Sequence, residues 1–167
     1  MSVVASMVVG ADGSTSPSTI LTNQSDRSSF LALRSSMDCI ITGGETFRNE
    51  SYQQTPVPLI VLSRTLSQPN QKNPSAHFWK SDPEFAISRA TKEFGQEIHV
   101  ECGPVLLQDF LDKKLIDRLH LTVTTHEGGS GFLSIEKVLS HFESIERTVE
   151  GENRKYCATK PRLLQRQ

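Results

Sequence analysis

The sequence predicts an α/β fold in which a mixed, mostly parallel central sheet carries helices on both faces. Short apolar segments alternate with segments whose apolar residues recur at helical spacing, which is typical of consecutive βα units. The end of the chain changes to strand patterns alone, which adds antiparallel strands to the sheet. A length of 167 residues fits one domain. We expect this domain to span 1–161 and the basic tail 162–167 to be frayed.

Three buried elements are expected in the first part of the chain. Residues 3–9 are apolar at nearly every position, which predicts a central strand covered on both faces, and Asp12-Gly13 gives the turn after it. A helix over 26–37 follows, with Ser25 as its expected N-cap. It leads to a second buried strand at 38–42, which runs into two glycines.

The middle of the chain continues the alternation. Asp82-Pro83 can begin a helix and Gly95 can end it. In 118–124 apolar and polar residues alternate, which favours a half-exposed strand rather than a central one. Trp79 is expected to anchor a polar loop. The other expected elements are strands at 59–63, 97–101, 142–149 and 154–160, and a helix at 105–114.

Charge and composition favour a small molecule as the main partner. Lys plus Arg number 18 and Asp plus Glu number 19, so there is no basic excess to bind a phosphate backbone or an anionic bilayer. No apolar run approaches the roughly 20 residues that cross a membrane. Three widely spaced cysteines indicate neither a disulfide framework nor a zinc knuckle. We therefore expect a cytoplasmic protein without nucleic-acid or membrane partners.

The most informative local segment is TGGETFR at 42–48. A buried strand opens into Gly43 and Gly44, and Thr46 follows where a helical turn can begin. Backbone N–H groups would then converge at the carboxyl end of the sheet, where an anion can bind. A glycine turn without a ligand is the alternative reading of this segment.

A second segment of the same design follows another strand. Gly103 allows close backbone approach, Pro104 suits the first position of a helix, and the helix N-terminus can hold a second part of an elongated dinucleotide. Two such segments at one sheet edge favour a nucleotide cofactor. His99-Val100-Glu101 matches half of a zinc-deaminase pattern, but the P-C-x-x-C half is missing from the sequence, so no metal is expected.

Together these segments resemble a known family. ASMVVGADG at 5–13, SDRSSFLALRSSMDCIITGGETFRNESY at 25–52 and VECGPVLLQDFLDKKLIDRLHL at 100–121 are similar, in the same order, to the reductase domain of the bifunctional riboflavin-biosynthesis deaminase/reductase. That family lies within the dihydrofolate reductase-like superfamily. The resemblance implies a three-layer dihydrofolate reductase-like fold, NADPH as the hydride donor and a homodimer.

The resemblance also assigns roles to residues. Arg34, Glu50 and Glu101 fall where the family places groups facing the substrate, and Asp12 matches its acidic S-x-D-G position. Glu101 and Glu50 are the expected catalytic carboxylates. Residues expected to contact NADPH are Thr22, Thr42, Gly43, Gly44, Thr46, Phe47, Gly103, Pro104, Val105 and Leu106. Arg48, two residues after Thr46, can pair with a ribose phosphate of the cofactor, and Arg64, just after the strand at 59–63, is the second candidate. A strand end such as that of Arg64 is a common place for a 2′-phosphate contact in dihydrofolate reductase-like proteins, so we expect Arg64 to bind the cofactor.

The chain departs from the family at positions that bear on the substrate. Ser14 stands where the family has a lysine, Gly10 where it has a serine, and 49–52 replaces its D-x-P-x-L-T-x-R segment. The expected activity is hydride transfer to a pyrimidine-type substrate, as in 5-amino-6-(5-phosphoribosylamino)uracil reductase. A pteridine-type substrate, or a nucleotide-binding module without turnover, are the alternatives.

Overall fold

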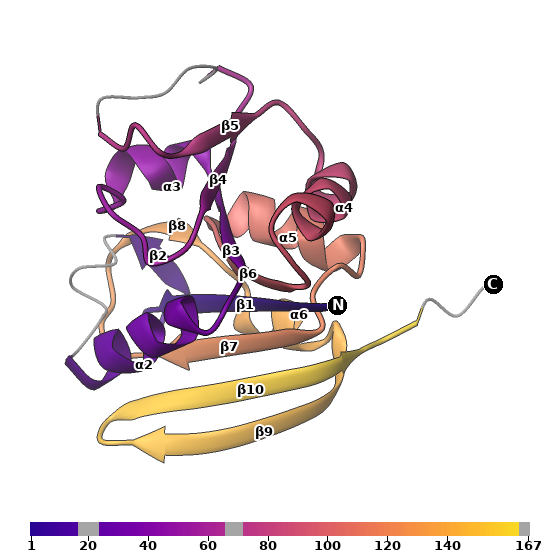
Figure 1. Ribbon diagram of the computed structural model, residues 1–167. Helices are drawn as coiled ribbons and strands as arrows, with labels where there is room; N and C mark the ends of the chain where they lie inside the picture. Colours follow the sequence, from indigo (N-terminus) through magenta and orange to yellow (C-terminus); the bar gives the residue numbers. More distant parts are fainter. Residues whose placement is uncertain (17–23, 66–71, 164–167) are drawn as a thin grey trace.

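The computed structural model describes residues 1–16, 24–65 and 72–163 and contains an eight-stranded sheet in the order β5-β4-β3-β6-β1-β7-β10-β9 (Figure 1). The first six strands in this order run parallel, whereas β10 and β9 add antiparallel pairs at one edge. The sheet strands are β1 (Ser2–Val9), β3 (Cys39–Gly43), β4 (Leu59–Leu62), β5 (His77–Trp79), β6 (Glu97–Glu101), β7 (Arg118–Val123), β9 (Phe142–Glu150) and β10 (Asn153–Pro161).

Helices cover both faces of this sheet, as predicted (Figure 1). One face packs against α4 (Pro83–Glu93) and α5 (Pro104–Asp112), and the other faces α2 (Gln24–Ser35) and α3 (Gly44–Asn49). A short helix, α6 (Ile135–Leu139), and a two-stranded sheet of β2 (Ser14–Ser16) and β8 (Ser130–Phe132) are the remaining elements among the described residues. The result is a mixed, mostly parallel α/β fold of the dihydrofolate reductase type.

Local sequence signals account for the helix starts. Asp82 caps α4 by accepting a hydrogen bond of 2.9 Å from the backbone N–H of Phe85, and Pro83 takes the first helical position. The helix α2 begins at Gln24, so Ser25, expected as its N-cap, lies inside its first turn. Gly95 has φ +141°, and a Cβ there would lie 2.2 Å from Asp38 Oδ2, so only glycine fits after α4.

Two strand expectations need correction. The strand at 118–124 is half-exposed, as expected, but it was not expected to be central, and β7 lies between β1 and β10 inside the sheet. Its alternation arises because one face packs in the core while the other lines an open cleft. Trp79 belongs to the edge strand β5 instead of a loop, and it is buried against Phe94. Polar residues flank this three-residue strand, so the sequence pattern does not reveal it.

The end of the chain is held further than expected. The backbone N–H of Arg162 donates to His141 O at 2.8 Å, and its Nε donates to Phe142 O at 3.0 Å. The first residue of the tail predicted to be frayed is therefore bonded to the domain. Residues 164–167 lie outside the described part of the chain.

Candidate active site

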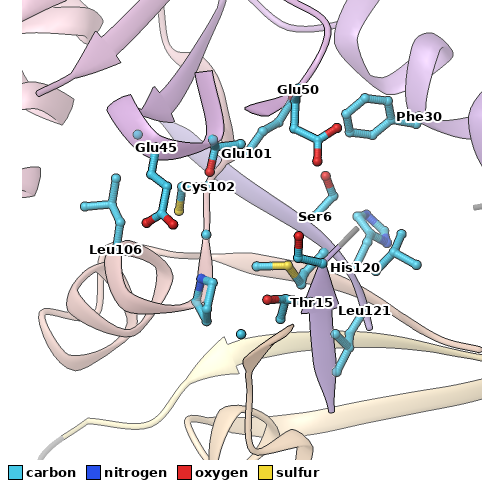
Figure 2. A pocket seen from close by; sticks show the side chains of 18 of the residues that line it. Ser6, Thr15, Phe30, Glu45, Glu50, Glu101, Cys102, Leu106, His120 and Leu121 are labelled. Carbon is cyan, nitrogen blue, oxygen red and sulfur yellow. The ribbon is translucent and has the colours of Figure 1, made fainter. Parts of the chain in front are cut away.

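A cleft of about 1580 Å³ lies at the carboxyl edge of the parallel strands (Figure 2). Its walls come from the ends of β3, β4 and β6, from the starts of α3 and α5, and from one side of α2. Its floor includes residues of β1, β7 and β10. Ligands of open parallel sheets bind at this edge, so this cleft is the candidate active site.

Two glycines begin the helices that face the cleft. Gly43 is the N-cap of α3 and Gly103 is the N-cap of α5, and neither helix has a side-chain cap. The glycines also permit close packing, since a Cβ at Gly44 would lie 2.8 Å from Ser63 Oγ and one at Gly43 would lie 3.2 Å from Leu106 Cδ2. This pair of backbone surfaces fits the diphosphate of a dinucleotide.

A buried ion pair forms one side wall of the cleft. Arg34 on α2 donates from Nε to Glu101 Oε1 at 2.7 Å and from Nη2 to Glu101 Oε2 at 2.6 Å. The phenol of Tyr52 donates to Oε2 at 2.8 Å. Arg34 is 8% exposed and Glu101 is 4% exposed. Protein groups thus bind both oxygens of the Glu101 carboxylate. This setting favours a structural role for Glu101, in which it holds Arg34 in place.

Burial and neighbouring charge act together on these groups. Burial opposes ionisation of Glu101, but hydrogen bonds from Arg34 and contact with His99 outweigh it and lower the pKa of the carboxyl. Burial likewise disfavours the charged guanidinium, yet Glu101 raises the pKa of Arg34. Burial and the adjacent Glu101 raise the pKa of Tyr52, so its phenol remains a proton donor to the carboxylate.

The cleft brings together most of the residues predicted from the sequence. Those that line it are Arg34, Gly43, Gly44, Thr46, Glu50, Arg64, Glu101, Gly103, Pro104, Val105 and Leu106. Thr42 and Phe47 are fully buried and absent from the lining; Thr42 lies beside the Tyr52 phenol, and Phe47 stacks on the Tyr52 ring at 6.2 Å. Thr22 lies outside the described residues.

Asp12 organises a loop outside the cleft lining. Its carboxylate accepts hydrogen bonds from the backbone N–H of Gly128 at 2.8 Å and from the hydroxyl of Ser14 at 2.7 Å. These bonds lower its pKa to about 2. Ser14 is only 1% exposed, so the position that carries a lysine in the family here points into the loop rather than the cleft. The substrate contact predicted for Asp12 stays a prediction.

Sequence reasoning missed four cleft-side residues. Tyr52 holds Glu101, Ser6 and His120 line the floor, and His99 lies buried behind Ser6. One available signal was the spacing of His99 and Glu101, which places both side chains on one face of a strand.

Within the described part of the chain, no group of three or more His, Cys, Asp or Glu side chains is placed to hold a metal ion. None of its helices is long and apolar enough to span a bilayer.

The fold and the cleft define an α/β protein of the dihydrofolate reductase-like class. The chain belongs to the RibD C-terminal domain family, whose model matches residues 2–129. No curated protein matches the sequence.

Solved structures of this fold come from several bacteria. A deaminase/5-amino-6-(5-phosphoribosylamino)uracil reductase of Thermotoga maritima matches with TM-score 0.71 and 15% identity over 95% of this chain and 56% of its own. RibD of Acinetobacter baumannii matches with TM-score 0.73 and 14% identity over 97% and 58%. This chain therefore spans little more than half the length of these two proteins.

A third structure has nearly the length of this chain. The pyrimidine reductase-like protein of Corynebacterium diphtheriae matches with TM-score 0.72 and 17% identity, over 97% of this chain and 92% of its own. At such identities the similarity shows the shared fold.

Proposed function

We propose that this protein is an NADPH-dependent reductase that transfers hydride to a pyrimidine-type substrate resembling 5-amino-6-(5-phosphoribosylamino)uracil. The observation that carries the proposal is the pair of glycine-led helices, α3 and α5, at one cleft. Bound NADPH would supply the hydride. The residues that would hold it are Gly43, Gly44, Thr46, Gly103, Pro104, Val105 and Leu106, all of which line the cleft.

Arg64 supports NADPH over NADH as the cofactor. It is exposed, lies two residues after β4 and lines the cleft beside the α3 glycines. A guanidinium at this strand end can form a charge-assisted, bidentate contact with a ribose 2′-phosphate. The same contact is absent with NADH, which carries a hydroxyl there.

The opposite part of the cleft would bind the acceptor. Figure 2 shows Glu50 and Ser6 extending toward the same space, where Glu50 can accept hydrogen bonds from ring N–H groups of a pyrimidine. The buried pair of Arg34 and Glu101 fixes the wall behind this space. Arg34 is held in place before the substrate arrives. It can therefore orient the acceptor without a conformational change of its own.

One observation favours the alternative of a nucleotide-binding module without turnover. Ser14 replaces the family's lysine and is buried in the Asp12 loop, so that position offers no cation to a substrate phosphate. Two assays separate the readings: equilibrium binding of NADPH, and steady oxidation of NADPH with a panel of pyrimidine and pteridine acceptors. Tight binding without oxidation on any acceptor would reject the reductase and leave the module.

The assembly and location follow from the family resemblance. We propose a homodimer acting in the cytoplasm. The edge strand β9 supports a dimer, since its outer pairing edge is open among the described strands and it exposes Ile145 (44%) and Val149 (64%). Sedimentation at micromolar protein tests this assembly, and a monomer there would reject it.

A further inference from the structure

Behind the cleft floor, a hydroxyl, an imidazole and a carboxylate stand in a row. Ser6 Oγ on β1 lies 2.8 Å from His99 Nε2 on β6, within hydrogen-bond distance. His99 Nδ1 lies 2.9 Å from Glu101 Oε1, without the alignment of a hydrogen bond. Ser6 lines the cleft and is half-buried, whereas His99 has no exposed surface. The row therefore leads from the cleft into the interior.

Strand register produces this arrangement. β1 and β6 are parallel neighbours with Val4 opposite His99, so Ser6 lies two residues further along β1 on the same face. His99 and Glu101 share that face of β6. Phe30 of α2 packs edge-on against the imidazole, with ring centroids 5.7 Å apart. The imidazole is thus held between the sheet and α2, with Ser6 between it and the cleft.

The groups around His99 leave one open path for a proton. Glu101, with its lowered pKa, is an anion beside the ring. Arg34 of α2 and the neutral Tyr52 phenol bind that anion, and His120 of β7 is the other ionisable neighbour of the ring. Arg34 and Tyr52 also occupy the carboxylate oxygens, so a proton on His99 has Ser6 as its route toward the cleft.

We propose that Ser6 is the acid of the reduction and that His99 stores the proton behind it. This inference rests on the proposed reductase function and defines its substrate class as a polar double bond, C=O or C=N. The acceptor carbon takes the hydride pair supplied by NADPH, and the π electrons move to the heteroatom. That atom takes the proton of Ser6 Oγ, and Ser6 takes the proton of His99 Nε2. After product release, water returns a proton to His99 through Ser6.

Figure 2 supports the direction of this transfer. Ser6 extends into the cleft with Glu50 above it and His120 beside it, where an acceptor would lie. Ser6 is the catalytic residue in this account, because it touches the reacting atom. His99 and Glu101 act through it.

The protonation of His99 tests the proposal without any turnover. Nitrogen NMR of the protein, with His99→Gln to assign its signals among the five histidines, reports which nitrogen of the ring carries a proton. We expect a proton on Nε2, the nitrogen that lies 2.8 Å from Ser6 Oγ. A ring without a proton on Nε2 overturns the relay, whatever the activity of the protein.

Kinetics of serine variants give the second test. With an acceptor that the parent reduces, we expect Ser6→Ala to lower kcat by about 10²-fold or more with unchanged NADPH affinity, and Ser6→Thr, which keeps the hydroxyl, to retain more rate. Ser36→Ala, which removes an exposed hydroxyl at the end of α2, should leave kcat unchanged.

The outcomes remain distinguishable. If the parent oxidises NADPH and Ser6→Ala has the same kcat, proton transfer through Ser6 and His99 is rejected. The proposed reductase function then still stands. A parent that reduces no acceptor rejects the reductase, and the NMR signal of His99 Nε2 then decides separately whether a proton is held behind the cleft.

Discussion

Glu101→Gln is expected to destabilise the fold strongly, because it leaves the guanidinium of Arg34 without its anion. Arg34 is 8% exposed, Glu101 is 4% exposed, and two charge-assisted hydrogen bonds of 2.7 Å and 2.6 Å join them. Removing one partner of such a buried pair costs about 3–5 kcal/mol. At about 2–4 °C per kcal/mol for a domain of this size, Tm should fall by about 6–20 °C.

Glu93→Gln is the matched control. Arg89 and Glu93 also form a contact of 2.6 Å, but their side chains are 43% and 40% exposed, and such a pair contributes about 0.3–0.5 kcal/mol. Urea unfolding of parent and both variants measures the difference. If Glu101→Gln loses no more unfolding free energy than Glu93→Gln, the buried pair does not hold the cleft wall and the reasoning fails.

Three further predictions concern pH and the cofactor. The folded pKa of Glu101 lies below its ordinary value of 4.5, so its stabilisation is complete above that value and lost as pH falls through the folded pKa; the gap in unfolding free energy between parent and Glu101→Gln should shrink in acid and stay constant at neutral pH. Gly44→Ala places a Cβ 2.8 Å from Ser63 Oγ in the lining of the cleft, so calorimetric titration should show weaker NADPH binding. Unchanged affinity would refute the proposed contact of Gly44 with NADPH. Arg64→Ala should narrow the preference for NADPH over NADH, whereas equal affinities of the parent for both would reject this contact.

The sequence predicted the elements whose signals are local. The strand expected at 97–101 is β6 with the same bounds, and Asp82-Pro83 begins α4 through its expected cap. The glycine segments also lie at one sheet edge, as expected from parallel strands. These features depend on periodicity, capping and turn chemistry within a few residues.

Features that depend on contacts between residues far apart in the sequence could not be predicted from it. Glu101 lines the cleft, and its expected contact with a substrate stays a prediction. Its bond to Arg34, 67 residues away in the sequence, cannot be read from either segment. Ser6 and His99 meet only through the register of β1 on β6. Phe47 follows the glycines by position, yet the helical turn of α3 directs it into the core with Tyr52. The position of a side chain relative to a cleft is decided by such tertiary contacts.

Transfer of deuterium from NADPH that carries deuterium at both C4 positions of the nicotinamide tests the proposed function most directly. The parent protein is incubated with labelled NADPH and 5-amino-6-(5-phosphoribosylamino)uracil, and the product is analysed by mass spectrometry. We predict that each product molecule gains one deuterium on carbon while NADPH is consumed in equal amount. Saturating NADPH binding with no labelled product from this acceptor, or from the pteridine and pyrimidine panel, would contradict a hydride-transferring cleft.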